Sequence, residues 1–203
     1  MKHHPLRCRC GTLQGLVQIS PAATRAVCYC SDCQAYARFL GGAVLDGSGG
    51  TEVVAIAPRQ LRFTSSLESL ACLSLSPRGL LRWYARCCST PIGNTPRNYK
   101  IAYVGLVHAC LGDALAREAS FGPLRLAVNP KSAMGPAASV GFGSSVLALG
   151  RLGASLLVAR LSGSYEQSPF FEPGTHAPLR TPYVLTATER SNAYRREAEG
   201  RSG

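Results

Sequence analysis

Several residue types are scarce in this 203-residue chain, and each scarcity limits what the protein can be. Acidic residues number 11 against 22 lysines and arginines, and only three of those basic residues are lysines. Aromatic residues make up 7% of the chain, so the alternation of basic and aromatic side chains typical of single-stranded nucleic-acid binding is weak. No segment repeats at a fixed period, which argues against a solenoid.

Long uninterrupted apolar runs are also missing. The first residues, Met1 to Gly11, are basic, but no apolar run follows them, so we expect no secretory signal and a cytoplasmic protein. The longest apolar tract, Ala137 to Leu161, contains Arg151 and Arg160, and a central arginine is costly in a bilayer. We therefore expect no membrane partner. The tract predicts a helix laid on a sheet or on a partner through a stripe formed by Val146, Leu149, Gly153, Leu156, Leu157 and Leu161, with packing on the core of the protein preferred.

Cysteine, in contrast, is abundant and clustered. Seven of the nine cysteines form three tight groups, Cys8-x-Cys10, Cys28-x-Cys30-x-x-Cys33 and Cys87-Cys88. In a reducing cytosol, clustered thiols bind metal more often than they form disulfides, and an odd number leaves one thiol over in any disulfide scheme. The pattern predicts a thiolate metal protein, with one or two zinc ions.

Cys28, Cys30 and Cys33 supply three thiolates from one short segment. A structural zinc site closes with four protein ligands, whereas a catalytic site keeps one position open. Three thiolates make zinc a weak Lewis acid that suits a soft sulfur ligand better than hydroxide. The alternative is an inert site completed by Cys72, Cys110, His108 or a water.

Cys8 and Cys10 resemble half of a second zinc site, and Gly11 behind them permits a sharp turn. Cys87 and Cys88 are the obvious source of the other half. A metal shared by these residues would tie the amino terminus to a later strand, which is a structural role.

The rest of the chain predicts a mainly β protein with added helices. Short strands are expected from residue 12 to residue 108, with a hairpin turn at Ser76–Gly79 and one short helix over Asp32–Leu40. Helical patterning returns around Asp113–Glu118 and in the apolar tract. The last forty residues are rich in proline and end in a charged tail.

The order of three blocks resembles a known family. Cys8-x-Cys10-Gly11, Cys28-x-Cys30-x-x-Cys33 and Cys88-Ser89-Thr90-Pro91 together are similar to the glutathione-dependent formaldehyde-activating enzyme and centromere protein V family, over about residues 5 to 110. The resemblance implies a zinc-bound, β-tent-like fold of short antiparallel sheets. It also implies a structural zinc on Cys8, Cys10 and Cys88, and a second zinc at the active site on Cys28, Cys30 and Cys33.

One position departs from that family pattern. Ala85 stands where the family has its first cysteine of the third block, so Cys87 replaces it or another donor completes the site. Beyond residue 110 the resemblance fades. We therefore expect a zinc-binding domain over residues 1–125 and a helical, proline-rich extension over 126–203 packed on it, with the last ~10 residues disordered.

Two functions fit these features. The first is a zinc-dependent carbon–sulfur lyase that acts on an adduct of an aldehyde with glutathione or a similar thiol. The second is a non-catalytic, zinc-stabilised module whose charge of +11 meets an anionic partner such as nucleic acid. Redox or metal buffering by Cys87-Cys88 is a third possibility.

Other polar residues receive mainly structural interpretations. Asp32 is expected to be the N-cap of the short helix, and His108 a core histidine. Cys72 is expected to be a buried free thiol. Arg38 and Arg86 are candidates to hold the carboxylates of a thiol substrate.

Overall fold

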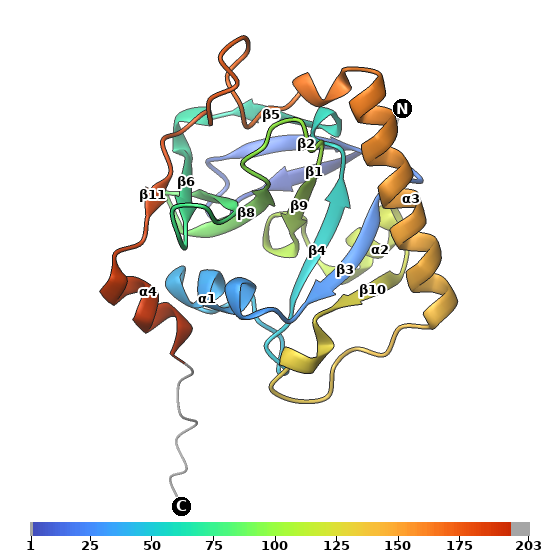
Figure 1. Ribbon diagram of the computed structural model, residues 1–203, viewed down its shortest axis with the longest axis horizontal. Coiled ribbons are helices and arrows are strands. Elements are labelled where there is room, and N and C mark those ends of the chain that lie inside the picture. The colour runs from blue at the N-terminus through green and yellow to red at the C-terminus, as the bar shows by residue number, and fades with distance from the viewer. Residues whose placement is uncertain (1, 196–203) are drawn as a thin grey trace, which may run out of the picture.

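The computed structural model describes residues 2–195. The chain forms a three-stranded sheet, an eight-stranded sheet and four α-helices (Figure 1). The strands are β1 His3–Arg7, β2 Gln14–Gln18, β3 Thr24–Cys28, β4 Thr51–Ile56, β5 Leu61–Ser65, β6 Leu70–Ser74, β7 Leu81–Ala85, β8 Thr90–Thr95, β9 Val104–Val107, β10 Leu124–Val128 and β11 Tyr183–Val184. The helices are α1 Ser31–Phe39, α2 Ala114–Phe121, α3 Phe142–Leu161 and α4 Ala187–Tyr194. The predicted mainly β architecture with added helices is confirmed.

The large sheet has the order β10-β3-β4-β9-β8-β7-β6-β11. Its inner pairs are antiparallel, as predicted, but the outermost pair at each edge, β10 with β3 and β11 with β6, is parallel. Both parallel edge strands come from the later part of the chain, which returns to cover edges that would otherwise offer unpaired backbone groups. The turn predicted at Ser76–Gly79 joins β6 to β7, with the Gly79 amide donating to the Ser76 carbonyl.

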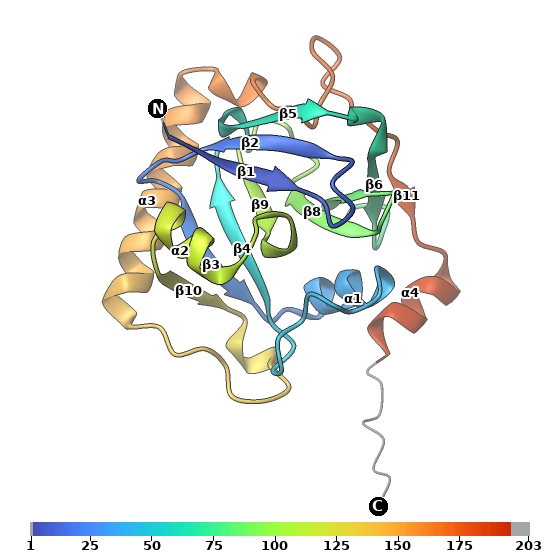
Figure 2. The same cartoon turned by 180° about the vertical axis from the view of Figure 1, so that it is seen from behind.

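The small sheet β1-β2-β5 packs across one face of the large sheet, as Figure 2 shows from behind. Alternate residues of each strand point into the space between the sheets, which is the period expected of a strand with one buried face. Trp83 is fully buried there, and its ring lies 4.9 Å from that of Phe170. The core also includes Leu6, Leu13, Val17, Val54, Ile56, Leu81, Ile92, Val104 and Leu106.

The opposite face of the large sheet carries α1 over β6 and β7. Tyr36 of α1 is buried and donates a hydrogen bond of 2.8 Å to the Trp83 carbonyl. The C-terminal helix α4 packs against α1, and Leu185 and Ala193 join Ala35 and Leu73 in a second apolar cluster. This arrangement brings the end of the described chain next to the beginning of α1.

The division into residues 1–125 and 126–203 remains a prediction. β10 crosses the proposed boundary and pairs with β3, so the two segments share one sheet. The disorder predicted for the last ~10 residues falls mainly on residues 196–203, which lie outside the described part of the chain.

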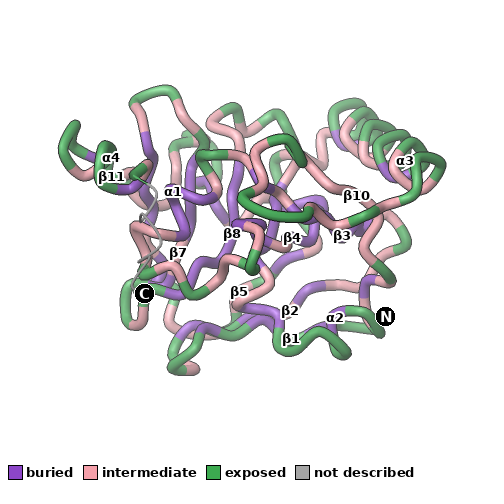
Figure 3. Tube along the Cα trace, turned by 90° about the horizontal axis from the view of Figure 1, so that it is seen from below, coloured by how far each residue is buried: buried purple, intermediate pink, exposed green. Residues whose placement is uncertain are grey.

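The preferred prediction that the stripe on α3 packs on the core of the protein is wrong. Of its six members, only Leu156 is even half-buried, while Val146, Leu149, Leu157 and Leu161 are more than half exposed. α3 instead contacts β10 through small residues, and Ala148 and Ala159 are its buried positions. Small side chains allow the helix to lie close to the strand, while the larger side chains of α3 are mostly exposed. Figure 3 shows α3 with long exposed segments.

Candidate metal centres

Two groups of cysteines could each hold a metal ion. The first contains Cys8, Cys10, Cys87 and Cys88, and the second contains Cys28, Cys30 and Cys33. Within each group all Sγ atoms lie within 4.8 Å of one another. All nine cysteines are free thiols. The structure thus brings together the predicted groups.

The four-cysteine cluster has sulfur separations that suit tetrahedral coordination. Cys10 Sγ lies 3.3 Å from Cys87 Sγ, and Cys8 Sγ lies 3.5 Å from Cys10 Sγ and 3.8 Å from Cys87 Sγ. Zinc–sulfur bonds of about 2.3 Å in a tetrahedron place sulfurs about 3.8 Å apart. These separations are far longer than a disulfide bond of about 2.05 Å. The donor set therefore fits a closed, thiophilic metal site.

Turns at both hairpins aim these sulfurs at one point. Gly11 has a φ of +80°, and its amide donates to the Cys8 carbonyl, which reverses the chain behind the first two cysteines. The Leu13 amide donates to Cys8 Sγ over 3.3 Å. Because Cys87 and Cys88 lie in the turn between β7 and β8, rather than in an extended strand, both side chains can face the cluster.

Ala85 is fully buried in the main core at the end of β7. Cys87, two residues later, is the residue whose sulfur approaches both Cys8 and Cys10. The turn thus brings a sulfur to the group although Ala85 has none, while the assignment of Cys87 as a metal ligand stays a prediction.

The three-cysteine cluster spans the end of β3 and the start of α1. Cys30 is the N-cap of α1, and its Sγ accepts a hydrogen bond of 3.3 Å from the Cys33 amide. The expectation that Asp32 caps this helix is wrong, because Asp32 lies inside the first turn and accepts a hydrogen bond of 2.5 Å from the Tyr194 hydroxyl. The helix N-terminus favours a negative group at Cys30.

Each cluster contains a thiol whose pKa is lowered, and in the four-cysteine cluster the pKa of Cys88 is lowered as well as that of Cys10. Hydrogen bonds from Cys28 and Cys33 lower the pKa of Cys30 to about 2, and the Arg82 guanidinium adds to the effect. A hydrogen bond with the Thr12 hydroxyl, 3.2 Å away, is the largest cause that lowers the pKa of Cys10 to about 6. Thiolates are the form that binds metal, so both clusters are prepared for it.

Arg82 is a site residue that the sequence interpretation missed. Its side chain is 2% exposed, and Nη1 lies 3.9 Å from Cys33 Sγ and 3.2 Å from Asn94 Oδ1. Asp32 is 3.9 Å away, too far for a direct hydrogen bond, and is more than half exposed. The signal was an arginine at the second position of the strand Leu81–Ala85, between Leu81 and Trp83. Three thiolates and a divalent ion would sum to one negative charge, which this buried guanidinium would balance.

Two hydroxyls also surround the second cluster. Thr51 is the cross-strand neighbour of Cys28, and its Oγ1 is buried without a hydrogen-bond partner in the described chain. Burial, together with the Cys33 and Cys28 thiols, raises the pKa of Tyr103 to about 12. Tyr103 therefore remains protonated beside the sulfurs. Neither residue was recognised from the sequence, because a single threonine or tyrosine forms no motif with its neighbours in the chain.

The other predicted candidates lie apart from the sulfurs. The Arg86 guanidinium donates to the Glu68 carbonyl, and Arg38 donates to Gln34 and to the Ala193 carbonyl. Cys72, Cys110 and His108 do not join the three-cysteine group within the described residues. Cys72 is buried, as expected.

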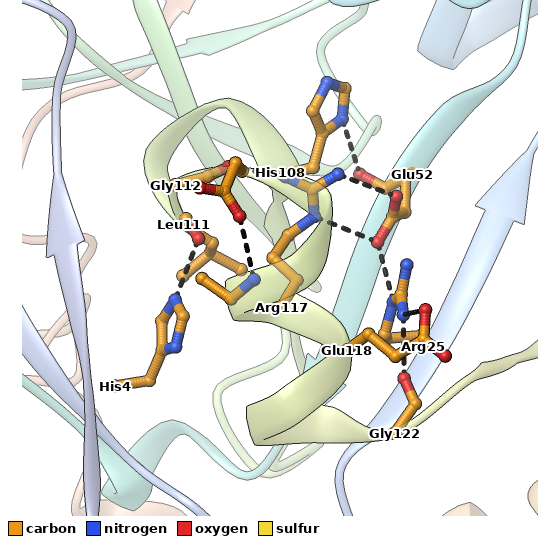
Figure 4. A network of polar contacts seen from close by, with 11 residues as sticks. His4, Arg25, Glu52, His108, Leu111, Gly112, Arg117, Glu118 and Gly122 are labelled. Atoms are coloured by element: carbon orange, nitrogen blue, oxygen red, sulfur yellow. Dashed lines mark hydrogen bonds and ion pairs between the residues drawn. The ribbon is translucent and has the colours of Figure 1, made fainter.

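A polar network holds β3, the strand that ends at Cys28 of the three-cysteine cluster. Glu52, next to Thr51 on β4, binds Arg25 of β3 at 2.8 Å and Arg117 of α2 at 3.1 Å (Figure 4). Burial opposes ionisation of Glu52, but the hydrogen bonds from both arginines outweigh it and lower its pKa. His108 is half-buried, and its Nδ1 lies 3.2 Å from the Glu52 carbonyl. The network ties β3, β4 and α2 together behind the face that carries Cys28.

The comparisons with known proteins give a family and no activity. A crystal structure of a protein from Rhodobacter sphaeroides matches with 20% identity and a TM-score of 0.41, over 61% of this chain and 99% of that one. No curated protein matches the chain. These comparisons lend no support to the resemblance to the formaldehyde-activating and centromere protein V family. The family model of DUF6151, a family of unknown function, matches residues 1–177, and the chain belongs to that family.

Proposed function

We propose that the protein binds zinc at both clusters and uses the three-cysteine cluster to join, or to split, a thiol and an aldehyde. The observation that carries the proposal is the difference in donor number. Four sulfurs surround one point and leave no place for a substrate, whereas three sulfurs leave one position open beside a buried arginine.

The residues present fit zinc rather than a hard cation. Every donor in both clusters is a cysteine sulfur, and such soft ligands select thiophilic metals over magnesium or calcium. When bound at the second cluster, zinc would supply a soft Lewis acid that favours the thiolate form of a substrate thiol. Cys28, Cys30 and Cys33 would hold it, and Arg82 would neutralise the excess negative charge.

The reaction itself is a simple addition. The sulfur lone pair of the substrate thiolate attacks the aldehyde carbon, and the π electrons of the C=O bond move to oxygen. That oxygen takes up the proton that the thiol released, so the product is a hemithioacetal and no other reagent is consumed. The protonated Tyr103 and Thr51 hydroxyls are the hydrogen-bond donors available to the developing oxyanion.

A cavity beside α1 offers room for the rest of a thiol substrate. It has a volume of about 560 Å³ and is lined by Asp32, Ala187, Arg190, Ser191 and Tyr194. Asp32 lies between Cys30 and Cys33 in the chain. Arg190 is the cation there that suits a substrate carboxylate. A thiol with carboxylates, such as glutathione, matches this combination.

The test measures metal content and reaction together. We expect two zinc ions per chain by elemental mass spectrometry, and accelerated exchange between formaldehyde and its glutathione adduct by NMR. Cys33→Ser should lose one ion and the acceleration but keep the fold by circular dichroism, whereas Cys72→Ala, outside both clusters, should keep both ions. Metal-loaded protein that leaves the exchange rate unchanged would contradict the lyase proposal.

The alternative of a zinc-stabilised binding module rests on the net charge of +11. Electrostatic binding of nucleic acid would weaken steeply with added salt. Tight, salt-dependent binding of an oligonucleotide by a protein that fails the exchange assay would favour this second function.

A further inference from the structure

The outward face of α3 is apolar along its whole length. Phe142 is 85% exposed, Leu161 is 79% exposed, and Val146 and Leu157 between them are more than half exposed. Gly143, Gly150 and Gly153 have open space where a side chain would extend. By length and composition the helix could cross a membrane, with a mean hydropathy of 1.5, and 11% of its most apolar window is buried. An exposed apolar surface of this extent marks an interaction site.

The helix is attached to the protein along one side. Ala148 and Ala159 are buried, and the Ser145 hydroxyl donates to the Arg125 carbonyl of β10 over 3.4 Å. The side that faces outward is opposite to this attachment, as the exposed green segments of α3 in Figure 3 indicate. A helix fastened in this way can lie on a surface but is not free to span a bilayer.

The charges on α3 itself and on the chain before it have one sign, and Glu166, in the turn Ser164–Glu166 that follows α3, is the first acid after the helix. From Ala119 to Tyr165 the chain contains no aspartate or glutamate, while Arg125, Lys131, Arg151 and Arg160 are all positive. Arg151 and Arg160 are exposed on α3 itself, where long basic side chains can reach lipid headgroups while the apolar face enters the acyl boundary. Within α3 the apolar residues are accompanied only by cations, which complement an anionic membrane surface.

A second copy of the chain fits this face less well. A helix of this length is about 30 Å long, and one side of it about 10 Å wide, so two copies would bury on the order of 600 Å² together, below the roughly 1,200 Å² of a stable interface. A two-fold pair would also bring the arginines of both copies to one interface with no acid on α3 to balance them.

We propose that α3 docks on the surface of a bilayer that contains anionic lipids, with Phe142, Val146, Leu157 and Leu161 in the interface. This proposal replaces the sequence-based expectation of no membrane partner. It is independent of the cysteine chemistry.

Vesicle sedimentation with the full-length, metal-loaded protein tests it. We expect binding to vesicles of phosphatidylcholine mixed with phosphatidylserine, and much weaker binding to phosphatidylcholine alone. Val146→Glu with Leu157→Glu should abolish binding, while Leu80→Glu, which places the same charge at an exposed leucine beyond the β6–β7 turn, should leave it unchanged. Replacing Arg151 and Arg160 with glutamine should weaken binding roughly five-fold for each arginine removed.

Three results would overturn the proposal. The first is no binding to either vesicle, and the second is equal binding to both, which would remove the role of the arginines. The third is a dimer in light scattering that Val146→Glu with Leu157→Glu disrupts, without vesicle binding, which would make this face an interface between copies. Circular dichroism of each variant checks that it is folded.

Discussion

The two cysteine clusters contain the same chemical group but join different parts of the fold. The four-cysteine cluster links the turn after β1 to the turn after β7, and its Cys10 and Cys87 are 77 residues apart in the chain. The three-cysteine cluster draws all its sulfurs from the end of β3 and the first turn of α1. A metal ion in the four-cysteine cluster would therefore connect the small sheet to the large one. A metal ion in the three-cysteine cluster would connect residues that are already close together in the chain.

The polar groups around the two cysteine clusters also differ. Cys10 and Cys87 are exposed, and the hydrogen-bond donors near the first cluster are mainly its own turns. The second cluster has a buried arginine, a buried unpartnered hydroxyl and a protonated phenol around it. A buried polar group is costly unless it is hydrogen-bonded, and the Thr51 hydroxyl has no such partner within the described residues. The contrast in donor number and surroundings supports the proposed division into a structural and a reactive site.

The largest effect should follow from breaking the first cluster. By loop-closure entropy, a crosslink across 77 residues restricts the unfolded chain by about 4–5 kcal/mol, against about 2 kcal/mol for the short second segment. We expect Cys10→Ser and Cys87→Ser each to lower the free energy of unfolding by several kcal/mol in urea titrations, and Cys33→Ser to lower it much less. Equal losses would contradict the division into a structural and a reactive site.

Glu52→Gln should loosen the strand pair beside the second cluster. Removing one partner of a buried ion pair costs about 3–5 kcal/mol, reduced here because the Glu52 side chain is 20% exposed. The folded pKa of Glu52 is depressed, so its stabilisation is present above the unfolded pKa and is lost as pH falls through the folded pKa.

The difference in unfolding free energy between wild type and Glu52→Gln should therefore be largest near neutral pH and shrink in acid. Urea unfolding of both proteins at several pH values measures it. Gln60→Glu, a reverse change at another half-buried position, serves as a control for charge alone. A difference that stays constant with pH would show that Glu52 is not the ionised centre of the network.

Arg82→Met should weaken metal binding at the second cluster only. Loss of a residue that supports metal ligands typically costs 10- to 100-fold in affinity, and here the cause is an unbalanced negative charge. Competition with a chromophoric chelator should show one weakened ion and one unchanged ion per chain. Arg62→Met removes an exposed arginine and should alter neither ion. Weakening of both ions would mean that Arg82 acts on the fold rather than on the charge.

The smallest expected change in stability is the loss of the helix cap at Cys30, which can be measured separately from the loss of metal binding. Serine can accept the hydrogen bond from the Cys33 amide, whereas alanine cannot, and the loss of an N-cap costs about 1 kcal/mol. Both Cys30→Ser and Cys30→Ala should lose the second ion, but in metal-free protein only Cys30→Ala should be less stable than wild type. Thermal unfolding with a chelator present compares them, and identical midpoints would contradict the capping role.

Much of the architecture was predictable because it depends on local patterns. Strand patterns predicted short strands from residue 12 to residue 108, where β2 to β9 lie, and the turn predicted at Ser76–Gly79 joins β6 to β7. β10, β11 and α4 were not predicted as elements. β11 has two residues and gains its backbone partners only from β6, so no local pattern specifies it.

The candidate sites divide in a similar way. Close spacing in the sequence requires the sulfurs of Cys28, Cys30 and Cys33 to lie near one another, whereas the meeting of Cys8 and Cys10 with Cys87 and Cys88 was expected from the sequence but depends on the tertiary fold. Arg82, Thr51 and Tyr103 were missed, since their role depends on which strands lie side by side. The error on α3 has the same origin: a helical apolar stripe is visible in sequence, but the side that packs depends on contacts with distant segments, and the residues that α3 buries are Ala148 and Ala159.

The sequence by itself determined the ligand chemistry of this protein, because thiol donors at short spacing can meet one ion in almost any fold. Only the tertiary structure decided that Cys8 and Cys10 face Cys87 and Cys88 across the molecule and that a buried arginine stands beside Cys33. It also decided that the apolar helix is exposed. The physical reason is that local spacing fixes what a segment can bind, whereas burial, charge balance and exposure arise from contacts between distant segments.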